Sequence, residues 1–197
     1  MTIRDAKLDF AYNPGDRDST DFIILHHAAG DGSAEDVHNY HKKVKGWSGI
    51  AYHFYVDKLG GVTKGREIEW NGGHTTGYNQ SSVGICFEGN FEADEMSAQQ
   101  LKAGAALLQM LREKYPEAKI TTHGALNATA CPGRKFPLEE MIAGSEKEVP
   151  SEWAQETVNE WIRLGILKGD SEEHYGLHEP VTLERMIVLV DRAIRSL

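Results

Sequence analysis

Two imidazoles and a thiol stand where they could bind one metal ion. His123 and Cys131 are eight positions apart, with Pro132-Gly133 directly after the sulfur, and the pair His26-His27 ends an apolar run far upstream. Two imidazoles and one thiolate can hold a zinc ion with an open fourth position, which makes the metal hydrolytic rather than structural. Spacing alone leaves a second interpretation open, in which the histidines are hydrogen-bonded at strand ends and the cysteine packs as a small apolar residue.

The residues around these groups form a series of ordered motifs. In chain order they are Ile24-Leu25-His26-His27-Ala28-Ala29, Gly46-Trp47, Ala51-Tyr52-His53-Phe54, Gly73-His74-Thr75-Thr76-Gly77-Tyr78-Asn79, Ser82-Val83-Gly84-Ile85-Cys86, and His123 followed by Thr129-Ala130-Cys131-Pro132-Gly133. Together they resemble the zinc N-acetylmuramoyl-L-alanine amidases, the amidase type 2 family that includes the phage T7 lysozyme and the peptidoglycan recognition proteins. The resemblance covers roughly residues 20–143. It implies hydrolysis of the amide that joins N-acetylmuramic acid to L-alanine in peptidoglycan.

The resemblance also implies roles for single residues near the metal. It makes His26, rather than His27, the zinc ligand of the pair, and His123 and Cys131 the other two ligands. Tyr52 matches the family's catalytic tyrosine, whose hydroxyl donates to the oxyanion or to zinc-bound water, although a core aromatic on a strand is the alternative. Thr129 matches a second catalytic position, where a hydroxyl can orient or stabilise but brings no charge.

Four residues are predicted to bind substrate. His74 matches a groove histidine of the family, and Thr75 follows it in the same loop. Trp47 could stack on a sugar or peptide face, or pack under the end of a helix. Asn79 is placed in the same groove, with closure of its own loop as the alternative. Glu88, near the end of a predicted strand, is expected to be a structural carboxylate or one that lies behind the site.

Short strands and two long helices are predicted to position these groups. Strands are expected at residues 22–26, 50–57, 62–66, 83–87 and 119–122, and helices after Ser33 and Ser97, the second ended by Pro116. On the first helix, His38 and His41 are expected on an exposed or groove-lining face. The pattern predicts an α/β fold with a mixed central β-sheet flanked by helices.

The end of the chain differs in composition. Residues 144–150 are predicted to be a linker between a catalytic domain at 1–143 and a small helical module at 151–197. The module resembles a single S-layer homology repeat, through Trp153, Gly165-Ile166, Gly169-Asp170 and Pro180-Val181-Thr182-x-Glu184, although Leu183 stands where the family motif generally has Arg. Such repeats bind secondary wall polymers. A helix pair this small has little core, so it is expected to dock on the catalytic domain or to form a homo-oligomer.

Composition excludes several classes of function. The net charge of −9 argues against nucleic acid as a partner, because phosphate binding needs clustered Lys and Arg. No segment approaches the ~20 apolar residues of a membrane span, and the first ten residues hold no apolar core of a secretory signal. The sequence therefore predicts synthesis in the cytoplasm, unless a signal has been removed, and action on the cell wall after release by a holin or another export route. Cys86 is expected to be a buried thiol, with a disulfide to Cys131 as the alternative.

Three functions follow from these observations. The first is a zinc-dependent amidase that degrades peptidoglycan, as a phage or prophage endolysin or a bacterial autolysin. The second is a non-catalytic peptidoglycan-binding module, which in the resembled family typically lacks the cysteine ligand. The third is a cytoplasmic amidase that recycles muropeptides, against which the module at 151–197 argues.

Overall fold

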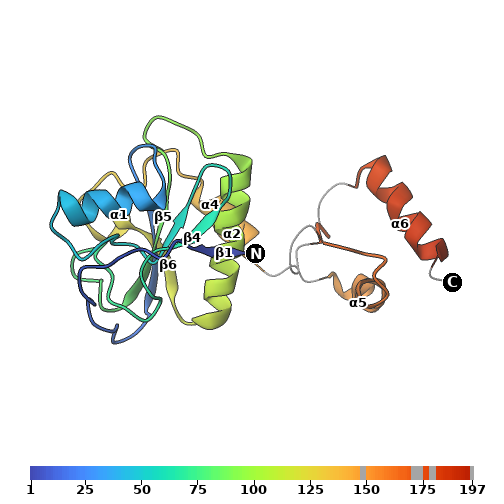
Figure 1. Ribbon diagram of the computed structural model, residues 1–197. Helices are drawn as coiled ribbons and strands as arrows, with labels where there is room; N and C mark the ends of the chain where they lie inside the picture. Colours follow the sequence, from blue (N-terminus) through green and yellow to red (C-terminus); the bar gives the residue numbers. More distant parts are fainter. Residues whose placement is uncertain (147–149, 170–174, 178–180, 196–197) are drawn as a thin grey trace. The chain divides into compact units, whose positions relative to one another are not determined.

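The computed structural model describes residues 1–146, 150–169, 175–177 and 181–195. Its contacts divide the chain into two units, Thr2–Ser145 and Glu146–Leu197, of which the second also includes Met1 (Figure 1). Helix α4 (Leu138–Gly144) and the buried Ser145 that follows it belong to the first unit. The boundary between the units therefore lies after Ser145, within the stretch predicted to be a linker.

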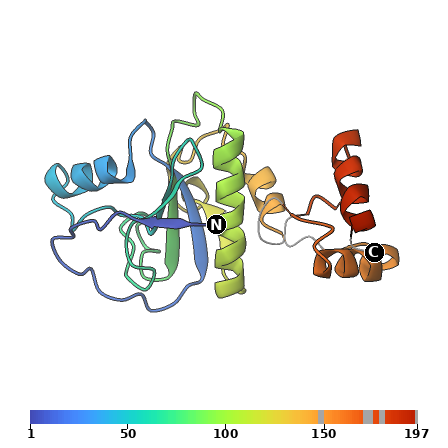
Figure 2. The same ribbon diagram turned by 45° about the vertical axis from the view of Figure 1, so that its right-hand side comes forward.

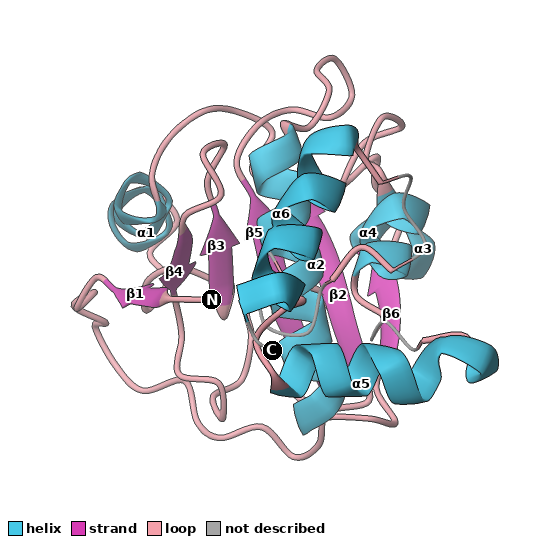
Figure 3. Ribbon diagram, turned by 90° about the vertical axis from the view of Figure 1, so that its right-hand side faces the viewer, coloured by secondary structure: helices cyan, strands magenta, loops and turns pink. Residues whose placement is uncertain are grey.

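A six-stranded mixed sheet forms the centre of the first unit. The strands lie in the order β1 (Ile3–Asp5), β4 (Val62–Lys64), β3 (Phe54–Val56), β5 (Ser82–Phe87), β2 (Phe22–His27) and β6 (Lys119–Thr122). The last four of these are mutually parallel, and β4 runs antiparallel to β3. Figure 3 views this sheet with the strands side by side. The predicted fold class is confirmed, with β1 as a strand that the sequence analysis missed.

The strand predicted at residues 50–57 is only three residues long. The regular strand begins at Phe54, and the N–H groups at the start of the predicted strand bond elsewhere. The N–H groups of Ile50 and Ala51 donate to histidine side chains of the first helix, α1 (Ala34–Lys43). Ile50 and Ala51 are thus held by side chains, whereas the N–H of His53 still donates to the carbonyl of Gly84 in β5.

Side chains along β2 and β5 alternate between two faces of the sheet. One face, which includes Leu25 and Phe87, packs against α2 (Ala98–Lys114) and α4 in the main core. The other face packs Cys86 and Tyr55 against α1. Figures 1 and 2 show α1 and α2 on opposite sides of the sheet. Ser33 and Ser97 cap α1 and α2 as predicted, each by accepting a backbone N–H in the first turn.

The second unit consists of η1 (Glu152–Ala154), α5 (Gln155–Arg163) and α6 (Leu183–Arg195) in its described residues. Thr182 caps α6 by accepting the N–H of Arg185, whereas Ser151 makes no side-chain cap. Six apolar side chains of α6 are exposed: Leu183, Met186, Ile187, Val188, Val190 and Ile194. Asp170 and Pro180 of the S-layer-like pattern lie outside the described residues. The wall-polymer and oligomerisation roles of this unit stay predictions.

Within the described residues, no helix combines the length and the apolar character that crossing a bilayer requires.

Candidate functional site

The carboxyl ends of the parallel strands gather the candidate metal ligands. Strand β2 ends with His26-His27, and β6 is followed directly by His123, the first residue of α3 (His123–Leu126). The β2–β6 register sets Leu25 opposite Thr122, so the residues that follow them, His26 and His123, also lie side by side. The ring centroids of His26 and His123 are 4.8 Å apart. Binding sites of open α/β sheets commonly lie at this edge.

The loop after α3 brings a sulfur to the same place. The carbonyl of Cys131 accepts the N–H of Gly124 at 2.7 Å, which folds the loop back onto the start of α3. Cys131 Sγ then lies 3.7 Å from Nδ1 of His26. One ligand atom from each of His26, His123 and Cys131 lies within 4.8 Å of the others. Two nitrogens and one sulfur in such a group suit zinc.

Only one histidine of the pair His26-His27 faces this cluster. Successive residues of a strand point to opposite faces, so the ring of His27 lies on the side of the main core. Its Nδ1 accepts the N–H of Phe91 at 3.2 Å. The second interpretation of the sequence, a hydrogen-bonded histidine at a strand end, describes His27.

Burial keeps the three groups of the cluster neutral. Burial lowers the pKa of His26, with His123 nearby adding to the effect, and burial also lowers the pKa of His123. Both rings are therefore neutral, and each has a lone pair that could bind a metal ion. Burial raises the pKa of Cys131 to about 11. A thiolate there needs a compensating positive charge, which a metal ion supplies. Cys86 is a separate, fully buried free thiol, and no disulfide joins it to Cys131.

Tyr52 lies beside the cluster, with its ring centroid 5.1 Å from that of His26. Burial raises the pKa of Tyr52, and the thiols of Cys86 and Cys131 raise it further. The phenol therefore keeps its proton and can only donate or accept hydrogen bonds as a neutral group. The side chain also packs against the core cluster that contains Cys86 and Tyr55, so the catalytic role of Tyr52 stays a prediction.

Two histidines of α1 hold the loop that leads to Tyr52. His38 and His41 are buried, so the prediction of an exposed or groove-lining face is wrong. Nδ1 of His38 accepts the N–H of Ile50, and Nδ1 of His41 accepts the N–H of Ala51, both at 3.2 Å. The i, i+3 spacing of the two histidines was the only sequence signal for this contact.

Trp47 packs at the end of α1, as one of its two interpretations predicts, and its contact with substrate stays a prediction. One face of the indole packs on the ring of His41, with centroids 4.8 Å apart, beyond the end of α1. The side chain is nevertheless 41% exposed. The exposed part is available to a ligand beside Tyr52, since both aromatic rings contact His41.

The loop that carries His74 buries two of the side chains predicted to bind substrate. Oδ1 of Asn79 accepts the N–H of His74 at 2.8 Å and that of Thr75 at 2.9 Å, so Asn79 closes its own loop. His74 and Thr75 are only 8% and 1% exposed. The burial of both side chains, and the engagement of Asn79 by its loop, argue against the substrate contacts predicted for these three residues.

Thr129 and Glu88 have separate surroundings. Thr129 is exposed, and its Oγ1 accepts the N–H of Cys131 at 3.3 Å, which leaves the hydroxyl proton free to donate. The two carboxylate oxygens of Glu88 accept the N–H groups of Gly32 and Lys58 at 3.0 and 2.9 Å. Glu88 therefore joins two loops, which is the structural role among its predicted alternatives.

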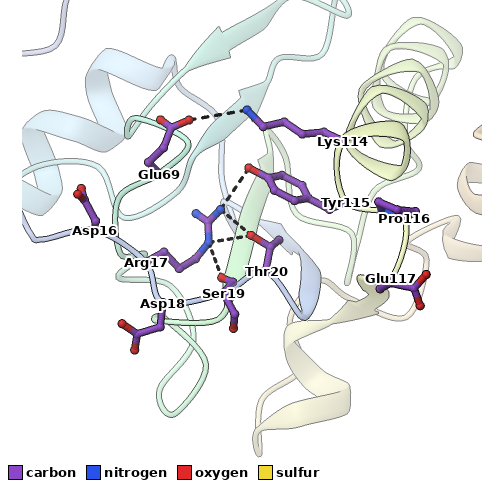
Figure 4. A pocket seen from close by; sticks show the side chains of 10 residues that line it. All are labelled: Asp16, Arg17, Asp18, Ser19, Thr20, Glu69, Lys114, Tyr115, Pro116 and Glu117. Atoms are coloured by element: carbon purple, nitrogen blue, oxygen red, sulfur yellow. Dashed lines mark hydrogen bonds and ion pairs between the residues drawn. The ribbon is translucent and has the colours of Figure 1, made fainter.

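A cavity of about 540 Å³ lies at the amino ends of β2 and β6, away from the metal-binding cluster (Figure 4). Its lining includes Arg17 and Tyr115, which precede these two strands. The guanidinium of Arg17 donates to Thr20 Oγ1, to the hydroxyl of Tyr115 and to the carbonyl of Ile68. These bonds tie the segment before β2 to the end of α2. The cavity contains none of the predicted site residues.

Comparison with known proteins gives concordant results. The model of the Amidase_2 family, described as N-acetylmuramoyl-L-alanine amidase, matches residues 16–134. The endolysin of Enterobacteria phage K11 is 33% identical over 121 residues, which cover 59% of this chain and 78% of the phage protein. Among solved structures, N-acetylmuramoyl-L-alanine amidase LysC from Clostridium intestinale URNW is 33% identical, with a TM-score of 0.70 over 73% of this chain and 96% of LysC. Peptidoglycan recognition protein LE, solved with tracheal cytotoxin, is 28% identical, with a TM-score of 0.63 over 68% of this chain and 86% of that protein.

Proposed function

The chain belongs to the Amidase_2 family of N-acetylmuramoyl-L-alanine amidases, and we propose that it uses zinc to hydrolyse the amide between N-acetylmuramic acid and L-alanine in peptidoglycan. The observation that carries this proposal is the convergence of His26, His123 and Cys131, whose ligand atoms lie within 4.8 Å of one another. This set of three leaves a fourth position for the reaction, as catalytic zinc sites do.

The three ligands have distinct tasks in this proposal. His26, through Nδ1, and His123 are neutral donors, and Cys131 contributes the one negative charge. A zinc ion held by them would supply Lewis-acid chemistry, which polarises a carbonyl and lowers the pKa of bound water. The sheet holds the two histidines at the ends of adjacent strands, so their relative position does not depend on a flexible loop.

Tyr52 is the donor that we assign to the oxyanion. A neutral phenol donates one hydrogen bond, and a donor aimed at developing charge is commonly the largest contribution to acyl transfer. The bonds from Ile50 and Ala51 to α1 fix the loop that carries it. Thr129, with its free hydroxyl proton beside Cys131, is assigned an orienting role, and the exposed part of Trp47 a contact with sugar or peptide.

The endolysin and amidase relatives support an enzyme that degrades cell wall, while the recognition-protein relatives keep binding without hydrolysis as the alternative. The presence of Cys131 in the cluster favours hydrolysis, because a peptide-binding groove has no need of a third metal ligand. Within the described residues, the second unit adds no further candidate metal cluster.

A digest of purified sacculi, analysed by mass spectrometry, tests the proposed bond. We expect free N-terminal L-alanine together with intact glycan strands. New reducing ends would show a glycosidase instead, and sedimentation with sacculi without any released peptide would show a binding module. Either of these two results would overturn the proposal.

A further inference from the structure

A buried histidine stands directly behind the candidate ligand His26. Nδ1 of His74 lies 3.0 Å from Nε2 of His26, on the side of the ring away from Cys131. The two rings meet edge to face, with an interplanar angle of 82°. Thr75 Oγ1 lies 2.9 Å from the same nitrogen of His74 and 3.4 Å from Nε2 of His26. His26 is therefore bracketed by the metal-binding cluster and by a polar group that solvent does not reach.

Two glycines make room for the ring of His74. A Cβ atom added at Gly72 or at Gly84 would lie 2.5 Å from Cδ2 of His74, closer than real Cβ contacts allow. Gly84 lies in the middle of the buried strand β5, where glycine weakens a strand and commonly marks a close approach of another group. The absence of side chains at Gly72 and Gly84 thus leaves the space in which this imidazole packs against β5.

The other buried histidines outside the cluster are used differently. His27, His38, His41 and His53 each accept a backbone N–H through Nδ1, from Phe91, Ile50, Ala51 and Gly84 respectively. His74 faces the side chain of a candidate ligand with that atom instead. Its placement is therefore not explained by the backbone-holding role that its counterparts share.

We propose that His74 is a positioning residue for the metal centre, which accepts the Nε2–H of His26 and so leaves Nδ1 of His26 as the zinc-binding atom. The inference rests on the proposed zinc function and adds to it the group that orients one ligand. Ligand histidines commonly donate their other N–H to a carboxylate, a carbonyl or water. Here a second imidazole takes that place.

The contact with Ser82 agrees with the tautomer that this arrangement requires. If Nδ1 of His74 accepts, the proton of that neutral ring is on Nε2. This atom lies 3.5 Å from Oγ of Ser82. Ser82 in turn donates its own proton to the carbonyl of Tyr78 at 2.6 Å, so its oxygen is free to accept. The loop closed by Asn79 thus also holds His74 in this orientation.

Zinc affinity of the full-length protein, measured by competition with a chromogenic chelator, tests this role without reference to activity. His74→Phe fills the site but removes the acceptor, and we expect zinc to bind about 10- to 100-fold more weakly. His74→Asn keeps an acceptor on the atom attached to Cγ, and its affinity should lie close to that of the unchanged protein. The cobalt-substituted protein should show the same order in its visible absorption, with the ligand field altered in His74→Phe and retained in His74→Asn.

His41→Phe is the matched control, because it removes another buried imidazole that does not touch a ligand. Its zinc affinity should be unchanged. Equal zinc affinity of His74→Phe and the unchanged protein would overturn the inference, as would an equal loss in His74→Asn and His74→Phe. Should His74→Phe fail to fold, His74→Gln replaces it, because the acceptor of glutamine lies one bond further from the backbone. Equal zinc affinity of His74→Asn and His74→Gln would then refute the role. Failure of the unchanged protein to bind zinc would instead refute the proposed function itself.

Discussion

Cys131 Sγ lies 3.7 Å from Nδ1 of His26, although 105 positions separate the two residues in the chain. Strand β2 delivers the histidine, and the loop after β6 and α3 delivers the sulfur. Because β2 and β6 are adjacent and parallel, both arrive at the same edge of the sheet. The metal-binding cluster is therefore a consequence of strand order, and its chemistry can be tested one residue at a time.

Replacing Cys131 by serine should remove zinc and hydrolysis together. The variant loses the only thiolate of the cluster, and we expect zinc affinity to fall by more than about 100-fold, the upper end of what loss of an outer partner of a ligand costs. Zinc content after dialysis and release of peptide from sacculi measure the two effects. Cys86→Ala is the control, because it removes the other thiol and should retain zinc. Full activity of Cys131→Ser with zinc bound would contradict the ligand assignment.

Replacing Tyr52 by phenylalanine should slow the reaction without weakening zinc. Loss of one oxyanion donor lowers kcat by about 10²- to 10³-fold in enzymes that use such donors. Steady-state kinetics on a soluble muropeptide give kcat and KM separately, and KM should change little. Tyr55→Phe is the matched control, since the hydroxyl of Tyr55 donates to the carbonyl of Gly32 in the core. An unchanged kcat in Tyr52→Phe would show that its hydroxyl takes no part.

Replacing Trp47 by alanine should raise KM more than it lowers kcat. An aromatic contact contributes about 0.5–1.5 kcal/mol, so KM for the soluble muropeptide should rise about 2- to 10-fold. Trp153→Ala serves as the control, because it removes an exposed tryptophan of the second unit. The same KM in both variants would assign Trp47 to packing on His41 alone.

Acid should destabilise the fold through buried neutral histidines. Burial, with Arg66 nearby, lowers the pKa of His41 to about 4, and burial lowers the pKa of His53 to about 3, from an ordinary 6.5. At a pH between these lowered pKa values and 6.5, the two histidines are protonated in the unfolded chain and neutral in the folded chain. Stability is complete above pH 6.5 and falls as the pH drops toward 4 and 3, with a slope of about 1.4 kcal/mol per pH unit for each such histidine.

His41→Asn isolates one of these protons, because the amide oxygen can still accept the N–H of Ala51 but does not titrate. Urea unfolding in the presence of a chelator, repeated across this pH range, should show a shallower loss of stability in the variant. Parallel curves for the variant and the unchanged protein would show that His41 is not one of the groups that couple folding to pH.

Local signals were sufficient for much of the first unit. Ser33 and Ser97 cap their helices, Pro116 follows the end of α2, and the apolar run from Phe22 forms β2, because capping and strand periodicity depend on neighbouring residues. Strand β1 was missed, since three partly exposed residues carry no periodic signal. The predicted strand at 50–57 was too long because side chains of α1, remote in sequence, take the N–H groups at its start.

The sequence by itself determined which donors exist and which elements carry them, because residue type and short-range pattern are local properties. Only the tertiary structure decided that His26 faces Cys131 while His27 faces the main core. The alternation of side chains along a strand shows that the two point to opposite faces, but not which elements cover each face. The same holds for His74. The sequence predicted that its loop binds substrate. The two glycines that leave space for its ring behind His26 are neighbours of that ring only in the folded protein, so their spacing along the chain does not reveal the contact.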